Sequence, residues 1–190
     1  MPEEKIRAGE SKRMNQSFDY NIVLIGFMGT GKSTISAYMK QKFGMEVIEM
    51  DQIIAQRQGM TISKIFETYG EEYFRELETN LLIELQEKKN LIISCGGGVP
   101  MKERNVVEMK KNGKVVLLTA TPETILKRVR NNHDRPLLEG RKNEAYISEL
   151  MEKRRAKYEA AADIQVATDN RNKQQICDEM VKKLRESEKS

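Results

Sequence analysis

The 190-residue sequence contains no tryptophan, one histidine and only two cysteines, and it lacks any long apolar run. Cys95 and Cys177 are too far apart in sequence to suggest a metal-ligand cluster, and such sparse cysteine is typical of a reducing compartment. No apolar stretch approaches the roughly 18–20 residues that span a bilayer, so we expect no membrane contact. Because the N-terminus also lacks the apolar segment of a secretion signal, we expect a cytoplasmic protein.

The sequence also lacks a large excess of either positive or negative residues. The 33 lysines and arginines are nearly balanced by 29 acidic residues, which leaves a formal net charge of +4. Nucleic-acid-binding proteins usually concentrate positive charge, and the basic stretch at residues 127–142 lacks interleaved aromatic residues, so we expect no nucleic-acid partner. A chain of this length predicts one domain, or one domain with a tail, that folds without disulfides or a structural metal.

Short apolar runs alternate with helical spacing from residue 21 onward. We expect buried strands at 22–25, 47–48, 91–93, 115–118 and, more weakly, 164–166. We expect helices at 32–43, across 51–89 with breaks at Gly59 and Gly70, at 102–111, from Pro122, at 143–160 and at 172–186, with a loop at 127–142. This alternation predicts an α/β fold with a doubly wound parallel sheet. Residues 1–19 are polar and aperiodic, so we expect a flexible N-terminal arm before a single domain at 20–190.

A glycine-rich segment follows the first expected strand. Residues 26–33 read GFMGTGKS and fit the pattern G-x-x-x-x-G-K-[ST] between a strand and a helix. The glycines let successive backbone N–H groups face phosphate oxygens, and the helix N-terminus adds the positive end of its dipole. Lys32 is expected to reach the β- and γ-phosphates, and the Ser33 hydroxyl to ligate Mg²⁺. The segment therefore predicts nucleotide binding, with these contact residues: Gly29, Thr30, Gly31, Lys32, Ser33 and Thr34.

Such a phosphate-binding loop occurs in motors, GTPases, helicases and small kinases. A single domain leaves little room for motor or helicase elements, and the Asn-Lys-x-Asp motif that reads guanine is absent. The third apolar run ends in Ser94 and Cys95 rather than in the usual aspartate. These features favour a small kinase with a three-layer α/β/α P-loop NTPase fold and a five-stranded parallel sheet.

Further motifs occur in a fixed order after the phosphate-binding loop. They are EMD at 49–51, GMTI at 59–62, IF at 65–66, GE at 70–71, FRELE at 74–78, GGG at 96–98, RPLL at 135–138, and Arg154 four residues before Tyr158. Together they resemble the shikimate kinase family, from about residue 21 to the last helix. The resemblance implies a helical substrate-binding insertion at about 50–80, a lid at about 128–142, and a monomer. It also implies ATP- and Mg²⁺-dependent phosphorylation of the 3-hydroxyl of shikimate, in the pathway to chorismate.

The resemblance implies roles for the residues that would bind the acceptor. Arg75 and Arg154 match the family's carboxylate-binding arginines, for which a planar guanidinium supplies two parallel hydrogen bonds. Asp51 matches the acid that contacts the acceptor hydroxyl and takes its proton, although an aspartate at this position is also a common helix cap. The matching substrate loop comprises Gly96, Gly97 and Gly98.

The nucleotide side follows from the same resemblance. Arg135 matches the lid arginine that reaches the transferring phosphate, and Arg128 matches the arginine that stacks on adenine. Ser94 is expected to contact Mg²⁺ through water. One position departs from the family pattern: the usual Asp-x-Asp is here Glu49-x-Asp51. Glu49 is one methylene longer and could still hold a metal-bound water, at some cost in metal affinity or turnover.

Two alternatives remain open at this point. The arginine pair suits any small carboxylate, so a kinase for another hydroxy acid, such as gluconate, is one rival. A nucleotide-binding regulatory module that has lost transfer activity is the other, and Glu49 is the one residue that favours it. The expected catalytic set speaks against such a loss: Lys32, Asp51 and Arg135 are all retained.

Overall fold

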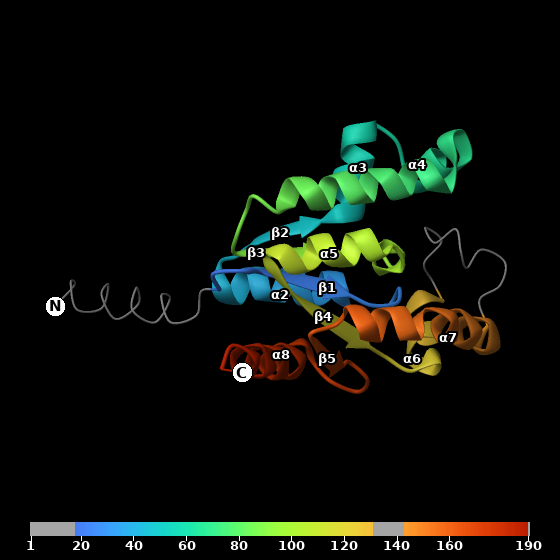
Figure 1. The fold of residues 1–190 in the computed structure, drawn as a ribbon. Helices are drawn as coiled ribbons and strands as arrows, with labels where there is room; N and C mark the ends of the chain where they lie inside the picture. Colours follow the sequence, from blue (N-terminus) through green and yellow to red (C-terminus); the bar gives the residue numbers. More distant parts are fainter. Residues whose placement is uncertain (1–17, 131–142, 190) are drawn as a thin grey trace.

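A single parallel sheet organises the molecule (Figure 1). The structure is a computed structural model, and it describes residues 18–130 and 143–189. The strand order is β2-β3-β1-β4-β5. The strands are β1 (Asn21–Ile25), β2 (Glu46–Glu49), β3 (Leu91–Ser94), β4 (Gly113–Thr119) and β5 (Ile164–Ala167). The five expected apolar runs are thus confirmed as strands, and each extends by one to three residues beyond its run.

The sheet is covered on both faces, which explains its continuous apolar strands. Successive side chains of a strand point to opposite faces. Ile22 and Leu24 accordingly pack in one core with helices α2 (Lys32–Phe43) and α8 (Lys173–Ser187). Val23 and Ile25 pack in the other core, to which α5 (Glu103–Lys111) and α7 (Glu144–Ala161) contribute. These layers confirm the predicted α/β/α fold.

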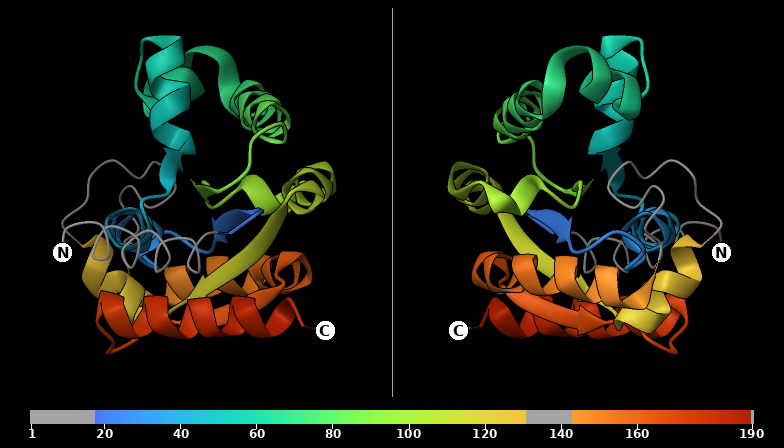
Figure 2. Two further views of the ribbon diagram at one scale, coloured as in Figure 1. Left: turned by 90° about the vertical axis from the view of Figure 1, so that its left-hand side faces the viewer. Right: turned by 90° about the vertical axis from the view of Figure 1, so that its right-hand side faces the viewer.

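Two helices, α3 (Met50–Gln58) and α4 (Ile62–Leu85), rise above the carboxyl end of β2, as Figure 2 shows. Gly59 ends α3 in the left-handed region at φ 64°, and Thr61 caps α4 by accepting a hydrogen bond from the Lys64 amide. Gly70 introduces a kink within α4 at φ 85°, ψ 170°. Both glycine breaks expected in this region are therefore present, and the pair of helices forms a wall beside the sheet edge.

The segment after β4 differs in part from its expected form. Helix α6 (Pro122–Val129) begins at the capping residue Thr121 and includes Lys127 and Arg128, where the sequence analysis placed a loop. That expectation was wrong because Ile125 and Val129, one helical turn apart, are both buried and hold this turn in the core. The short helix η1 (Val99–Met101) was not anticipated. The remainder of the expected lid lies outside the described residues.

The predicted arm at 1–19 also lies largely outside the described residues, which begin at Phe18. Phe18 is only 2% exposed, and the centroid of its ring lies 6.3 Å from that of Phe43. The Arg185 guanidinium of α8 lies 4.1 Å from the centre of the Phe18 ring. The core of the domain therefore includes Phe18. Within residues 18–130 and 143–189, no helix combines the length and apolar character needed to cross a bilayer.

Candidate active site

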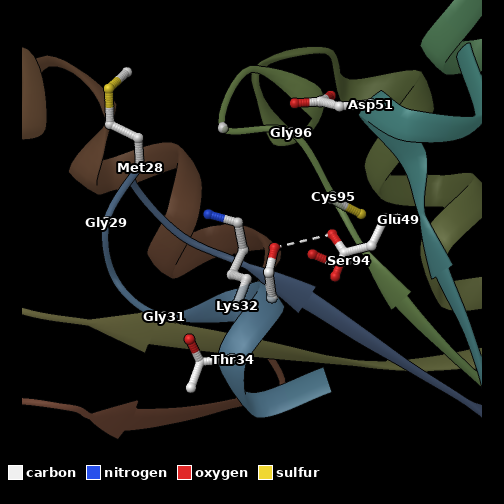
Figure 3. Close-up of a pocket in the computed structure, with 12 residues that line it drawn as sticks. Met28, Gly29, Gly31, Lys32, Thr34, Glu49, Asp51, Ser94, Cys95 and Gly96 are labelled. Carbon is white, nitrogen blue, oxygen red and sulfur yellow. Dashed lines mark hydrogen bonds between the residues drawn. The ribbon is translucent and has the colours of Figure 1, made fainter. Parts of the chain in front are cut away.

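The carboxyl ends of three strands meet around one cavity. Glu49, which ends β2, pairs in register with Ser94 at the end of β3, and Ser94 pairs with Leu24 of β1. Ligand sites in parallel α/β sheets commonly lie at this edge. The cavity has a volume of about 150 Å³ (Figure 3). Its lining consists of Met28, Gly29, Gly31, Lys32, Ser33, Thr34, Glu49, Asp51, Ser94, Cys95, Gly96 and Gly97.

The glycine-rich loop curls into this cavity because its backbone takes conformations that side chains disfavour. Gly26 has a φ of 143°, and a Cβ there would overlap the Leu118 carbonyl of β4. Gly31 precedes α2 in the left-handed region at φ 100°, and this N-cap residue supplies no side-chain capping hydrogen bond. The first turn of α2 therefore presents its backbone N–H groups and its positive dipole end to an anion.

Lys32 lies beside the loop that precedes it. Its ammonium group donates to the carbonyl oxygens of Gly26, at 2.8 Å, and Phe27, at 3.1 Å. Thr30 is buried and donates to the same Phe27 carbonyl at 2.8 Å, which fixes the turn from inside. Figure 3 shows the Lys32 side chain directed into the cavity, toward Gly96. The charge is thus positioned for a phosphate bound by the loop.

A carboxylate and several hydroxyl groups occupy the floor of the cavity. Ser33 Oγ donates to Glu49 Oε2 at 3.1 Å, drawn as the dashed line in Figure 3. Ser94 is 4% exposed and lies beside Glu49 across the strand pair. Among the described residues, no three His, Cys, Asp or Glu side chains form a cluster that could hold a metal alone. Mg²⁺ is usually held by one or two carboxylates together with substrate phosphates and water, so this donor set fits Mg²⁺.

The expected substrate loop brings charged side chains together because it has none of its own. A Cβ on Gly96 would lie 2.9 Å from Asp51 Oδ1 and 2.9 Å from Glu78 Oε1. A Cβ on Gly98 would overlap the Arg75 guanidinium. The bare backbone of this loop therefore permits an acid from α3 and an ion pair from α4 to approach it closely.

Arg75 is held in place by two carboxylates and two rings. Its Nη1 donates to Glu78 Oε2 at 2.8 Å, while Nη2 and Nε donate to Glu71 Oε1 at 2.9 and 3.2 Å. Its guanidinium carbon lies 5.4 Å and 5.9 Å from the ring centres of Phe74 and Phe66. Burial alone would lower the pKa of Arg75, but its two carboxylate partners raise it. A planar cation is thereby fixed beside the glycine loop before any ligand arrives.

Glu78 is the residue of this site that the sequence analysis did not identify. Its side chain is fully buried, and this burial raises its pKa to about 7. The effect of burial outweighs the opposing effect of Arg75, and nearby Asp51 adds a smaller increase. Its Oε1 accepts no hydrogen bond from any described residue. A sequence signal was present: Glu78 lies four residues after Phe74 and four before Leu82, both buried on the same face of α4. A carboxylate within an apolar stripe indicates a partner at that position.

Arg154 reaches the middle of the loop from α7. A Cβ on Gly97 would lie 3.4 Å from Arg154 Nη1 and 3.4 Å from the Tyr158 hydroxyl. Tyr158 donates to the Gly97 carbonyl at 2.6 Å, and burial raises the pKa of its hydroxyl. The Arg154 guanidinium carbon lies 5.9 Å from the centre of the Phe27 ring in the phosphate-binding loop. Arg75 and Arg154 thus contact adjacent glycines from different helices.

A second cavity of about 400 Å³ lies on the other side of the phosphate-binding loop. Arg128 lies at its border: its Nη1 donates to the Gly29 carbonyl and to Thr168 Oγ1, and its Nη2 to the Thr168 carbonyl, each at 3.0 Å. It therefore ties the phosphate-binding loop to the segment after β5. The lining consists of Gly29, Thr30, Gly31, Thr34, Ile35, Arg128, Thr168, Arg171, Lys173 and Ile176. Because Gly29, Gly31 and Thr34 line both cavities, the two are neighbours.

The family model described as shikimate kinase matches residues 28–185 of this sequence. The chain belongs to the shikimate kinase family. It is 40% identical to a shikimate kinase of Persephonella marina over 165 residues, which is 87% of this chain and 99% of the relative. A Dehalococcoides mccartyi shikimate kinase is 39% identical over 168 residues, or 88% and 95% of the two chains. The solved structure of Acinetobacter baumannii shikimate kinase in complex with shikimate has a TM-score of 0.86 and 30% identity, covering 92% and 98%.

In this member of the shikimate kinase family, the expected site residues that the structure describes line the first cavity or lie against residues that line it, apart from Arg128 at the second. The phosphate side consists of residues 26–34 with Glu49 and Ser94. The acceptor side, as we call it, consists of Asp51, Arg75, Glu78, Arg154 and the glycines at 96–98. Arg135 lies outside the described residues, so its predicted contact with the transferring phosphate stays a prediction.

Proposed function

We propose that this protein transfers the γ-phosphoryl group of ATP to the 3-hydroxyl of shikimate, giving shikimate 3-phosphate and ADP in the pathway to chorismate. The observation that supports this most strongly is that the phosphate-binding loop, Asp51 and the glycine loop line one cavity, while Arg75 and Arg154 lie against that glycine loop. Membership in the shikimate kinase family supports the same acceptor. The phosphate side binds the donor, and the acceptor side binds a small hydroxylated carboxylate.

On the acceptor side, Arg75 and Arg154 bind the shikimate carboxylate through charge-assisted hydrogen bonds. Asp51 orients the 3-hydroxyl and takes its proton late in the reaction. A bond forms between that hydroxyl oxygen and the γ-phosphorus, while the bond from the γ-phosphorus to the bridging oxygen breaks and its electron pair leaves with ADP. Because phosphoryl transfer has a loose transition state, the position of Asp51 matters more than its basicity.

On the phosphate side, the backbone of the loop and Lys32 hold the phosphates. Ser33, together with Glu49 and Ser94 through water, would hold Mg²⁺, which would neutralise charge on the phosphate oxygens. Arg128 borders the cavity of about 400 Å³, which we assign to the nucleoside. Arg135 belongs to the proposed lid at about 128–142, where closure excludes water that would otherwise hydrolyse ATP.

We assign the kinase domain to residues 20–190 together with Phe18, whose ring packs in its core, the acceptor-binding region to about 50–80, and an arm of no assigned role to the residues before Phe18. The protein acts as a cytoplasmic monomer on small molecules, without nucleic-acid or membrane partners. The balanced charge of the chain supports the absence of a nucleic-acid partner.

The deciding experiment measures ADP release by the purified protein with ATP and Mg²⁺ in the presence of shikimate, gluconate or no acceptor. We expect turnover with shikimate alone. Turnover with gluconate instead would reassign the acceptor to another hydroxy acid. If no acceptor gave ADP release while the protein still bound ATP, the result would indicate a regulatory module that has lost phosphoryl-transfer activity.

A further inference from the structure

The carboxylate of Glu49 is held by two serines of α2, one at each oxygen. Ser33 Oγ donates to Oε2 at 3.1 Å, and Ser36 Oγ lies 2.8 Å from Oε1. Ser33 lines the cavity, whereas Ser36 lies one helical turn deeper and is 0% exposed. Glu49 therefore connects a buried hydroxyl to the hydroxyl that faces the phosphates.

The single hydroxyl hydrogen of Ser36 has two acceptors within reach. The Ser33 carbonyl lies at 3.0 Å and Glu49 Oε1 at 2.8 Å. The carboxylate is the nearer and the charged one, and hydrogen bonds to charged acceptors are roughly twice as strong as neutral ones. Ser36 thus favours one rotamer of Glu49, in which Oε2 faces Ser33.

We propose that Ser36 is a positioning residue for the metal of the bound nucleotide, acting through Glu49. A serine hydroxyl that ligates a cation does so through an oxygen lone pair, and its proton must then be directed to another acceptor. Glu49 Oε2 is that acceptor for Ser33, and Ser36 keeps it in place. The inference rests on the proposed function only in requiring that this site binds a nucleotide with a divalent cation.

The same geometry fits a glutamate at position 49 better than an aspartate. An aspartate would place its carboxylate about one carbon–carbon bond, ~1.5 Å, closer to the strand. From that position it could not keep both the 3.1 Å contact with Ser33 and the 2.8 Å contact with Ser36. Glu49 and Ser36 therefore act as a unit. A change at either residue should weaken metal binding as much as changes at both.

The test is calorimetric titration of the full-length protein with ADP, in Mg²⁺ and separately in EDTA. The ratio of the two dissociation constants reports the contribution of the metal without any turnover. We expect Ser36→Ala to reduce this ratio about fivefold, as loss of one hydrogen bond implies. Glu49→Asp should reduce it by a similar factor, and the double variant should lose no more than either single one.

Two matched variants serve as controls. Ser187→Ala removes a hydroxyl from α8 that likewise bonds the carbonyl three residues earlier, and Glu46→Asp makes the same shortening at the exposed start of β2. Both should keep the wild-type ratio. An unchanged ratio in Ser36→Ala, or losses that add in the double variant, would overturn the proposal, even if Ser36→Ala lowered thermal stability. Should Ser36→Ala fail to fold, an unchanged ratio in Glu49→Asp would overturn it alone.

The result of this ADP titration can be told apart from a failure of the proposed kinase function. The titration uses no acceptor, so absence of turnover with shikimate leaves the ratio measurable. A wild-type protein whose ADP affinity is equal in Mg²⁺ and in EDTA would overturn the role of Ser36, whatever the acceptor proves to be.

Discussion

The phosphate side and the acceptor side of the cavity are built in different ways. The phosphate side is largely one continuous segment, residues 26–34, whose backbone groups face the ligand. The acceptor side gathers charged side chains from α3, α4 and α7 around a loop after β3. The first is specified by local backbone geometry and one lysine. The second depends on contacts between residues far apart in sequence.

Among the variants that test this difference between the phosphate side and the acceptor side, Lys32→Ala is expected to have the largest effect. We expect kcat to fall about 10²–10³-fold, because a cation positioned at the phosphates is lost. Shikimate binding should remain, since Lys32 belongs to the phosphate side. Rates of ADP release and shikimate titrations measure the two effects separately, with exposed Lys40→Ala on the same helix as the control. Parallel loss of shikimate affinity would erase the distinction between the two sides.

The acceptor side should also carry a pH dependence, through Glu78. The pKa of Glu78 is about 7 in the folded chain, raised by burial, against about 4.5 for an ordinary glutamate. The folded state therefore binds this proton more tightly than the unfolded state does. Its contribution to stability is fully present below about pH 4.5 and is lost as the pH rises to about 7. That pKa difference corresponds to at most about 3 kcal/mol.

The variant Glu78→Gln removes this titration. We expect the free energy of unfolding of the wild type, minus that of the variant, to decrease as the pH rises from 5 to about 7.5. Urea unfolding at both pH values measures it. Glu84→Gln is the control, because the hydrogen bond with Arg57 lowers the pKa of that exposed carboxylate. A difference that stays constant with pH would show that Glu78 is ionised throughout the range.

A smaller effect is expected when the shape of a cation changes but its charge does not. Arg75→Lys should raise KM for shikimate about 10–100-fold and leave KM for ATP nearly unchanged, since lysine cannot form two parallel hydrogen bonds. Arg154→Lys should act in the same direction. Arg57→Lys is the matched control, because that arginine forms a bidentate pair with Glu84 at an exposed position. If both KM values rose together, the assignment of the carboxylate to these arginines would be wrong.

The smallest effect is expected for Tyr158→Phe. The hydroxyl donates to the Gly97 carbonyl at 2.6 Å, and its loss should cost about 1 kcal/mol of unfolding free energy. KM for shikimate should rise a few-fold because the loop is less well fixed. Thermal unfolding and steady-state kinetics measure both, with Tyr73→Phe as the control, whose hydroxyl bonds Gln58 on the surface. Equal effects in the two variants would remove any special role for the loop contact.

The difference between a locally specified phosphate side and an acceptor side built from distant residues also determines what could be predicted from the sequence. The phosphate-binding loop and all five strands were predicted, because each depends on a few neighbouring residues and their period. The ion pair of Arg75 with buried Glu78, and the contact of Ser36 with Glu49, were not. Both depend on which helix face meets which strand end, a property of the assembled molecule. The final turn of α6 was missed because its basic residues concealed the burial of Val129.

The pairing of Arg75 has a thermodynamic consequence for ligand choice. Glu71 Oε1 accepts from Nε and Nη2 of Arg75, although 59% of the Glu71 side chain is exposed. An incoming acceptor carboxylate competes with Glu71 for the same cation, so its binding is in part an exchange of one carboxylate for another. The gain from this ion pair is reduced by the pairing that it replaces. Discrimination among acceptor molecules must therefore come from the hydroxyl groups on the acceptor's ring, one of which Asp51 is proposed to orient.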